Sequence, residues 1–88
     1  MTEQQTILLE ALAPGARAVV RELRGGTTFA SRVAGMGISL GCHVEVLQNP
    51  AHGPLLVRVR GTRIALVHGE ASKIVVTELR GERPTSDE

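Results

Sequence analysis

The chain has 88 residues, a length that accommodates one domain and excludes a cofactor-binding enzyme built from two subdomains. Leu, Ile, Val and Phe account for 25 residues, too many for an intrinsically disordered chain, and ten Val against one Phe favour an aliphatic core built from strands. The net charge of +1 and the lack of Trp and Tyr argue against nucleic-acid binding, and a single cysteine excludes an internal disulfide.

The N-terminal part of the chain predicts a short apolar segment that packs over the core, followed by a strand. The apolar run 7–12 ends at a Pro-Gly turn and forms either one helical turn or an edge segment. Alternating apolar residues predict a strand over 16–23. Leu23 falls on the wrong parity for the apolar face of that strand, which indicates a bulge or a bend.

A short helix is predicted after the glycine pair 25–26. Thr27 or Thr28 is the expected N-cap. Gly37 is placed to adopt the left-handed conformation that ends a helix. Apolar residues at helical spacing form one stripe that faces the core: Phe29, Val33 and Met36.

The remaining chain predicts four further strands, two of which form a tight hairpin. The hairpin turn is expected at 61–62, and residues 68–72 are expected to form a turn or a single 3₁₀ turn. Strands are predicted over 41–47, 55–60, 63–67 and 73–79. The side chains expected to point inward are Cys42, Val44, Val46, Leu55, Val57, Val59, Ile64, Leu66, Ile74 and Val76.

Five to six short strands with one short helix predict a mainly β fold, a small antiparallel barrel. Closing the sheet would bury its apolar face and limit exposed edges. We expect one domain over 1–79 with residues 1–6 loose, and a disordered polar tail over 80–88. The sequence contains no pattern of a signal peptide or of a membrane-spanning helix, so a cytoplasmic protein without membrane insertion is expected.

One motif is typical of hydrolases. The run 37–41 matches the pattern G-x-S-x-G with Ser39 as its serine. His68, with Glu45 or Glu70, would complete a triad on paper. In hydrolases the motif follows a strand and opens a helix above a large sheet, whereas here the order is reversed and the chain is too short. We therefore interpret the motif as a turn bounded by glycines and expect no enzyme.

The possible metal ligands are scattered. His43, His52 and His68 have no partner at i+3 or i+4, and Cys42 has no C-x-x-C mate. We predict no metal site and no cofactor, with Cys42 buried among valines. A weak contact of His43 and His52 with a divalent metal such as zinc or iron, shared between molecules, is the alternative.

A basic surface is predicted on the hairpin over 55–67. Arg58 and Arg60 share the strand face of Leu56, Arg63 follows the turn, and the sequence has no acidic residue between Ala51 and Gly69. Three readings stay open: solvated arginines on an exposed face, a docking surface for an acidic partner, and an RNA-binding hairpin. The RNA reading lacks aromatic residues for stacking on bases and lacks net charge.

Several blocks of the sequence together carry a family resemblance. The first blocks are Leu12-x-Pro14-Gly15, Gly25-Gly26 and Arg32-Val33-x-x-Met36-Gly37-Ile38-x-x-Gly41-x-x-Val44-Glu45-Val46-Leu47. The later ones are Gly53-Pro54-Leu55-x-Val57-Arg58-Val59-Arg60-Gly61-Thr62-Arg63-Ile64-Ala65-Leu66 and Ala71-x-x-Ile74-x-Val76. In combination, over roughly residues 7–77, they resemble the FeoA family of ferrous-iron transport proteins.

The resemblance implies an SH3-like β-barrel with a helix inserted after the first long strand. It implies a cytosolic, non-catalytic interaction module that acts on FeoB, the membrane ferrous-iron transporter with a cytosolic G-protein domain. We expect the partner to dock on Leu56, Arg58, Arg60 and Arg63. The same barrel is appended to iron-dependent repressors, so a metal-binding or metal-sensing barrel is the alternative function. A homo-oligomer is also possible, through an exposed edge strand or the segment 7–12.

Overall fold

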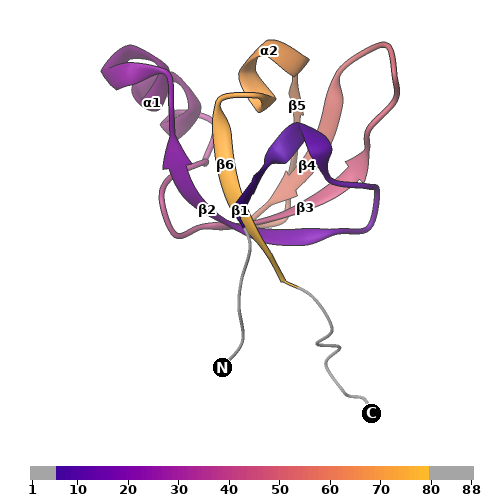
Figure 1. Ribbon diagram of the computed structural model, residues 1–88. Coiled ribbons are helices and arrows are strands. Elements are labelled where there is room, and N and C mark those ends of the chain that lie inside the picture. The colour runs from indigo at the N-terminus through magenta and orange to yellow at the C-terminus, as the bar shows by residue number, and fades with distance from the viewer. Residues whose placement is uncertain (1–5, 80–88) are drawn as a thin grey trace.

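A single antiparallel sheet of six strands organises the protein, and the computed structural model describes residues 6–79 of it (Figure 1). The strands are β1 (Thr6–Leu8), β2 (Arg17–Leu23), β3 (His43–Gln48), β4 (Leu55–Val59), β5 (Thr62–Leu66) and β6 (Ile74–Leu79), in the sheet order β1-β6-β2-β3-β4-β5. The 3₁₀ helix η1 (Leu9–Ala11) follows β1, α1 (Gly26–Ala34) joins β2 to β3, and α2 (His68–Ala71) joins β5 to β6.

The expected disordered tail over 80–88 and the loose residues 1–5 lie outside the described residues. Thr6, also expected to be loose, belongs to β1 and is paired with Thr77 of β6. The apolar run 7–12 therefore contributes both an edge strand and a helical turn, the two forms that its sequence allowed. Within residues 6–79, no helix combines the length and the apolar character that a bilayer crossing requires.

The core lies on the inner face of the curved sheet, because every second side chain of a strand points to that side. All ten side chains predicted to point inward are buried there. Leu9 and Leu12 from the N-terminal segment, and Phe29, Val33 and Ile38 from α1 and the loop after it, complete the cluster. The aliphatic composition thus packs into one core with a single aromatic ring.

The predicted irregularity near the end of β2 is confirmed. The pairing of β2 with β6 shifts register between Val20 and Glu22, where an extra residue enters β2. The shift changes the parity of the strand, so that Leu23 also packs against the core.

The N-terminus of α1 differs from the prediction that a threonine caps it. The N-cap is Gly25, and the helix begins at Gly26, before Thr27 and Thr28. A β-carbon on Gly25 would lie 2.4 Å from the Cβ of Phe29, so the aromatic side chain occupies the space that a larger capping residue needs. Packing of the core therefore decides this cap.

The C-terminus of the helical segment is as predicted. Gly37 has a φ of 98°, and its N–H donates to the carbonyl of Ala34 at 2.9 Å. The N–H of Ile38 donates to the carbonyl of Val33 at 3.0 Å. These two bonds form a Schellman motif, which requires the left-handed residue that glycine provides at low cost.

The expectation that the sheet closes into a barrel is wrong in one respect. β1 and β5 are the two ends of the strand order and are not paired with each other. β1 has only three residues, because the chain turns into η1 at Leu9. Instead, η1 and α2 contact each other at one end of the sheet, and bury Leu9 and Ala71 there (Figure 1). The fold is an open, SH3-like barrel, in which η1 and α2 pack against each other at one end and the edge strands β1 and β5 stay unpaired with each other.

Candidate interaction surface

The turn of the β4–β5 hairpin lies one residue earlier than predicted. Val59 pairs with Thr62, so the two central residues are Arg60 and Gly61, with φ angles of 53° and 81°. Two positive φ values are typical of a type I′ turn, whose twist matches the twist of the flanking strands. Glycine suits such a position, whereas arginine is strained there. Arg60 is the only residue other than glycine among residues 6–79 with a positive φ.

This turn changes the predicted basic surface. Leu56, Arg58 and Arg63 lie on the outer face of the hairpin, where Arg58 is directly opposite Arg63. Arg60 does not share that face: it leaves the strand and occupies the exposed tip. The four predicted residues are thus brought to one hairpin, three on a face and one at its tip.

The arginines of the hairpin differ in their partners. Arg58 Nη1 donates to Glu45 Oε1 of the neighbouring β3 at 2.9 Å, so its charge is already paired. Within residues 6–79, neither Arg60 nor Arg63 forms an ion pair, and both are exposed. The two arginines available to an acidic partner are therefore Arg60 and Arg63.

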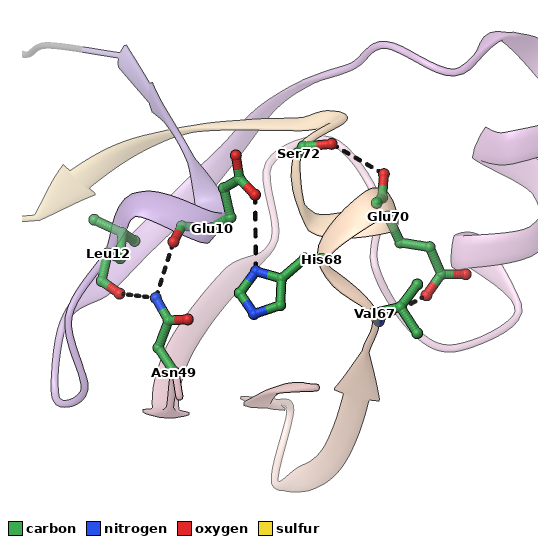
Figure 2. Close-up of polar contacts among 8 residues, drawn as sticks. Glu10, Leu12, Asn49, Val67, His68, Glu70 and Ser72 are labelled. Atoms are coloured by element: carbon green, nitrogen blue, oxygen red, sulfur yellow. Dashed lines mark hydrogen bonds and ion pairs between the residues drawn. The ribbon is translucent and has the colours of Figure 1, made fainter. Parts of the chain in front are cut away.

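A cluster of polar side chains lies at the contact between η1 and α2 (Figure 2). The sequence analysis did not predict this cluster. The side chain of Asn49, just after β3, donates its Nδ2 hydrogens to the carbonyl oxygens of Glu10 and Leu12 at 2.9 and 2.7 Å. These are helix-end carbonyls that lack partners in the backbone. An asparagine beside a proline is typical of a turn, which is the only signal that its sequence carried.

His68 completes this cluster. Its Nδ1 lies 3.8 Å from Glu10 Oε1, and its Nε2 is buried without a hydrogen-bond partner among the described residues (Figure 2). His68 thus lies at the contact between α2 and η1, and within residues 6–79 it does not belong to a group of three side chains that could hold a metal ion.

The other histidines lie apart from this cluster. His43 is exposed at the start of β3, and His52 is exposed in the loop before β4. Over residues 6–79, no three His, Cys, Asp or Glu side chains converge in a way that could hold a metal ion. Cys42 is buried, as predicted.

The hydrolase-like motif lies in the loop between α1 and β3. Each acid that could complete a triad is engaged elsewhere: Glu45 with Arg58, and Glu70 with Arg32 of α1 at 2.7 Å. The backbone carbonyl of Ser39 accepts the N–H of Cys42 at 3.1 Å, as expected for a turn leading into β3.

Comparison with known sequences agrees with the fold. The family model of the FeoA domain matches residues 7–78. A putative Fe(2+) transport protein A of Methanocaldococcus jannaschii is 31% identical over 64 residues, which cover 73% of this chain and 77% of that protein.

Solved structures give the same result. The crystal structure of the iron uptake regulatory protein FeoA has a TM-score of 0.82 and 28% identity, covering 85% of this chain and all of that one. Stenotrophomonas maltophilia FeoA complexed with zinc, described as an SH3 domain protein, has a TM-score of 0.71 and 29% identity over 84% of this chain and 96% of that one. A manganese-dependent transcriptional repressor, 22% identical with a TM-score of 0.78, shares the fold over 90% of this chain and 45% of its own.

Proposed function

This chain belongs to the FeoA family of ferrous iron transport, and on that premise we propose that it is a non-catalytic module that docks on the cytosolic part of the transporter FeoB. The proposed docking surface is the β4–β5 hairpin with Leu56, Arg58, Arg60 and Arg63. In this role the module binds in the cytoplasm and alters the transporter's state or assembly without a chemical step of its own.

The observation that carries the proposal is the arginine at the hairpin tip. Arg60 occupies a left-handed position that asparagine or glycine would fill with less strain. Strained residues that persist on a surface are concentrated at functional sites. With Arg63 nearby and no acidic residue between Ala51 and Gly69, the hairpin offers two uncompensated positive charges to an acidic partner.

The test is binding of this protein to the purified cytosolic domain of its cognate ferrous transporter, measured by interferometry with and without guanine nucleotide. The variant with both Arg60→Glu and Arg63→Glu is expected to lose about tenfold or more in affinity, since two attractive charges become repulsive. A dependence on nucleotide would identify a regulator that responds to the G-protein state, and indifference would identify a scaffold.

The matched control is Arg24→Glu. Arg24 is an exposed arginine that follows β2, away from the hairpin, and forms an ion pair with Glu22. The control is expected to bind like the wild type. Because the control reverses one charge and the test variant reverses two, a free-energy loss in the control about half that of the double variant would reduce the effect to net charge. Unchanged binding of the double variant would place the docking surface elsewhere.

A further inference from the structure

The outer edge of β5 carries unpaired backbone groups. β5 is the last strand of the sheet order, so only β4 is paired with it. In a hairpin with a two-residue turn, the residues flanking the turn exchange backbone hydrogen bonds, and this pattern repeats at every second residue. Thr62, Ile64 and Leu66 therefore bond to β4, whereas the N–H and C=O groups of Arg63 and Ala65 point away from the sheet.

These groups have no other partner among the described residues, and the open edge ends after them. No turn, loop or side-chain hydrogen bond within residues 6–79 uses the backbone of Arg63 or Ala65. The next outward residue, Val67, is already engaged. Its N–H donates to Glu70 Oε1 at 3.3 Å, and its carbonyl accepts the N–H groups of Glu70 and Ala71 at 2.9 and 3.0 Å.

The side chains along this edge change from basic to apolar. Arg63 and Ala65 are exposed on the outer face, and Val67, in extended conformation, is 59% exposed. Leu56 of β4 lies directly opposite Ala65 and is half-buried. A strand added beside β5 would thus meet one positive charge and, on the same face, a small apolar strip.

We propose that an extended segment of a partner protein adds to the edge of β5 in antiparallel orientation, with an acidic side chain beside Arg63 and apolar side chains beside Ala65 and Val67. Read from its N-terminus, the segment carries apolar, any, apolar, any, acidic residues, because alternate side chains share a face. That this partner is the transporter rests on the function proposed above. The strand edge itself is a separate claim.

Charge favours such a partner over a second copy of this chain. Two copies paired through β5 would bring two sets of Arg60 and Arg63 to one sheet with no carboxylate between Ala51 and Gly69 to neutralise them. The free edge is also short, which is a common protection against pairing of a strand with its own copies. An acidic segment gains from the charge that a second copy would oppose.

The first experiment uses ¹⁵N-labelled full-length protein and a synthetic peptide, acetylated and amidated, of sequence Thr-Val-Thr-Val-Thr-Glu-Thr. We expect the amide signals of Arg63 and Ala65 to shift and to become protected from exchange, because they acquire acceptors. The signals of Ile64 and Leu66, already bonded to β4, should change less. The same peptide with Lys in place of Glu is expected to bind about threefold to tenfold more weakly.

Two variants separate the backbone from the charge. Ala65→Pro removes an outward N–H group, a change that edge strands tolerate, and is expected to weaken binding of the peptide about fivefold. Ala65→Val keeps the N–H group and serves as the control. Arg63→Glu should reverse the preference and favour the lysine peptide. This charge exchange needs no proline and tests the proposal even where Ala65→Pro destabilises the fold.

The outcomes distinguish this inference from the proposed function. Absence of peptide shifts up to about 5 mM, or shifts away from Arg63 and Ala65, would overturn the edge proposal whatever the transporter does. Protection of both amides in the free protein, together with a dimer in sedimentation, would also overturn it, by assigning the edge to a second copy. Binding of the transporter domain with Ala65 unprotected would leave the proposed function standing and reject only the strand edge.

Discussion

β6 and β5 belong to the same sheet but are buried in different ways. β6 lies between β1 and β2, and its first four residues, Ile74 to Thr77, are all buried. On the outer face, Thr77 accepts a hydrogen bond from Nε of Arg21 at 3.1 Å. β5 is paired on one side only and alternates between exposed and buried residues. The inner strand is covered on both faces, and the edge strand is covered on one.

On the proposal made above, one small sheet divides stability from recognition between these two strands. A strand that is covered on both faces contributes to the core and has no groups left for a partner. A strand at the edge keeps backbone groups and one row of side chains free. In this protein the free row contains Arg63, and the adjacent tip contains the strained Arg60. Substitutions in the two regions should therefore affect different measurements.

The largest effect on stability is expected in β6. Ile74→Ala removes a side chain with no exposed surface and leaves a cavity, which should lower the free energy of unfolding by about 3 kcal/mol. Chemical denaturation followed by circular dichroism measures it. The control in β5, Arg63→Ala, should change stability by less than about 0.5 kcal/mol. Comparable losses in the two strands would remove the proposed division between them.

An intermediate effect on stability is expected where the side chain of Asn49 holds the end of η1. Asn49→Ala removes two hydrogen bonds to the carbonyls of Glu10 and Leu12 and should destabilise the protein by about 2 kcal/mol. Hydrogen exchange should show faster opening of η1 than of β3. Gln48→Ala, an exposed neighbour on the same segment, is the control. A loss of stability no larger than that of the control would show that η1 is held in place by the packing of Leu9 rather than by the hydrogen bonds of Asn49.

The smallest effect on stability has the opposite sign. Arg60→Asn places a residue that tolerates positive φ in the turn and should stabilise the protein by about 0.5–1 kcal/mol, while it weakens binding of the acidic partner. Arg63→Asn removes the same charge from an extended position and should give no stabilisation. Denaturation and binding measured on the same two variants test the exchange of stability for recognition. Unchanged or lower stability of the Arg60 variant would contradict it.

Local patterns predicted most of the fold because the responsible contacts are local. Strand faces follow from alternation along β4 and β5, the bulge follows from the parity of Leu23, and the helix end follows from Gly37. The helix cap was wrong because Phe29, four residues away from Gly25, decides it through packing. The β4–β5 turn was predicted one residue too late. An arginine at positive φ is uncommon, so the prediction started the turn at the glycine instead.

Features that depend on distant parts of the chain could not be predicted. Closure of the barrel depends on whether β1 reaches β5, and the chain leaves the sheet at Leu9 instead. The cluster of Glu10, Asn49 and His68 joins three segments that are far apart in sequence. The charge pattern of the sequence was enough to predict the arginines of the candidate surface. The pairing of Arg58 with Glu45 could not be predicted, because it depends on the register between β3 and β4.

The position of β6 also has a consequence for synthesis of the protein. β6 is the last strand to leave the ribosome, yet it lies in the sheet between β1 and β2, which are made first. Until about residue 79 emerges, β1 has no neighbour and β2 can pair only with β3. The nascent chain can therefore form the hairpin of β4 and β5 early, while its core waits for the end of translation. The hairpin proposed for recognition is complete before the fold that carries it.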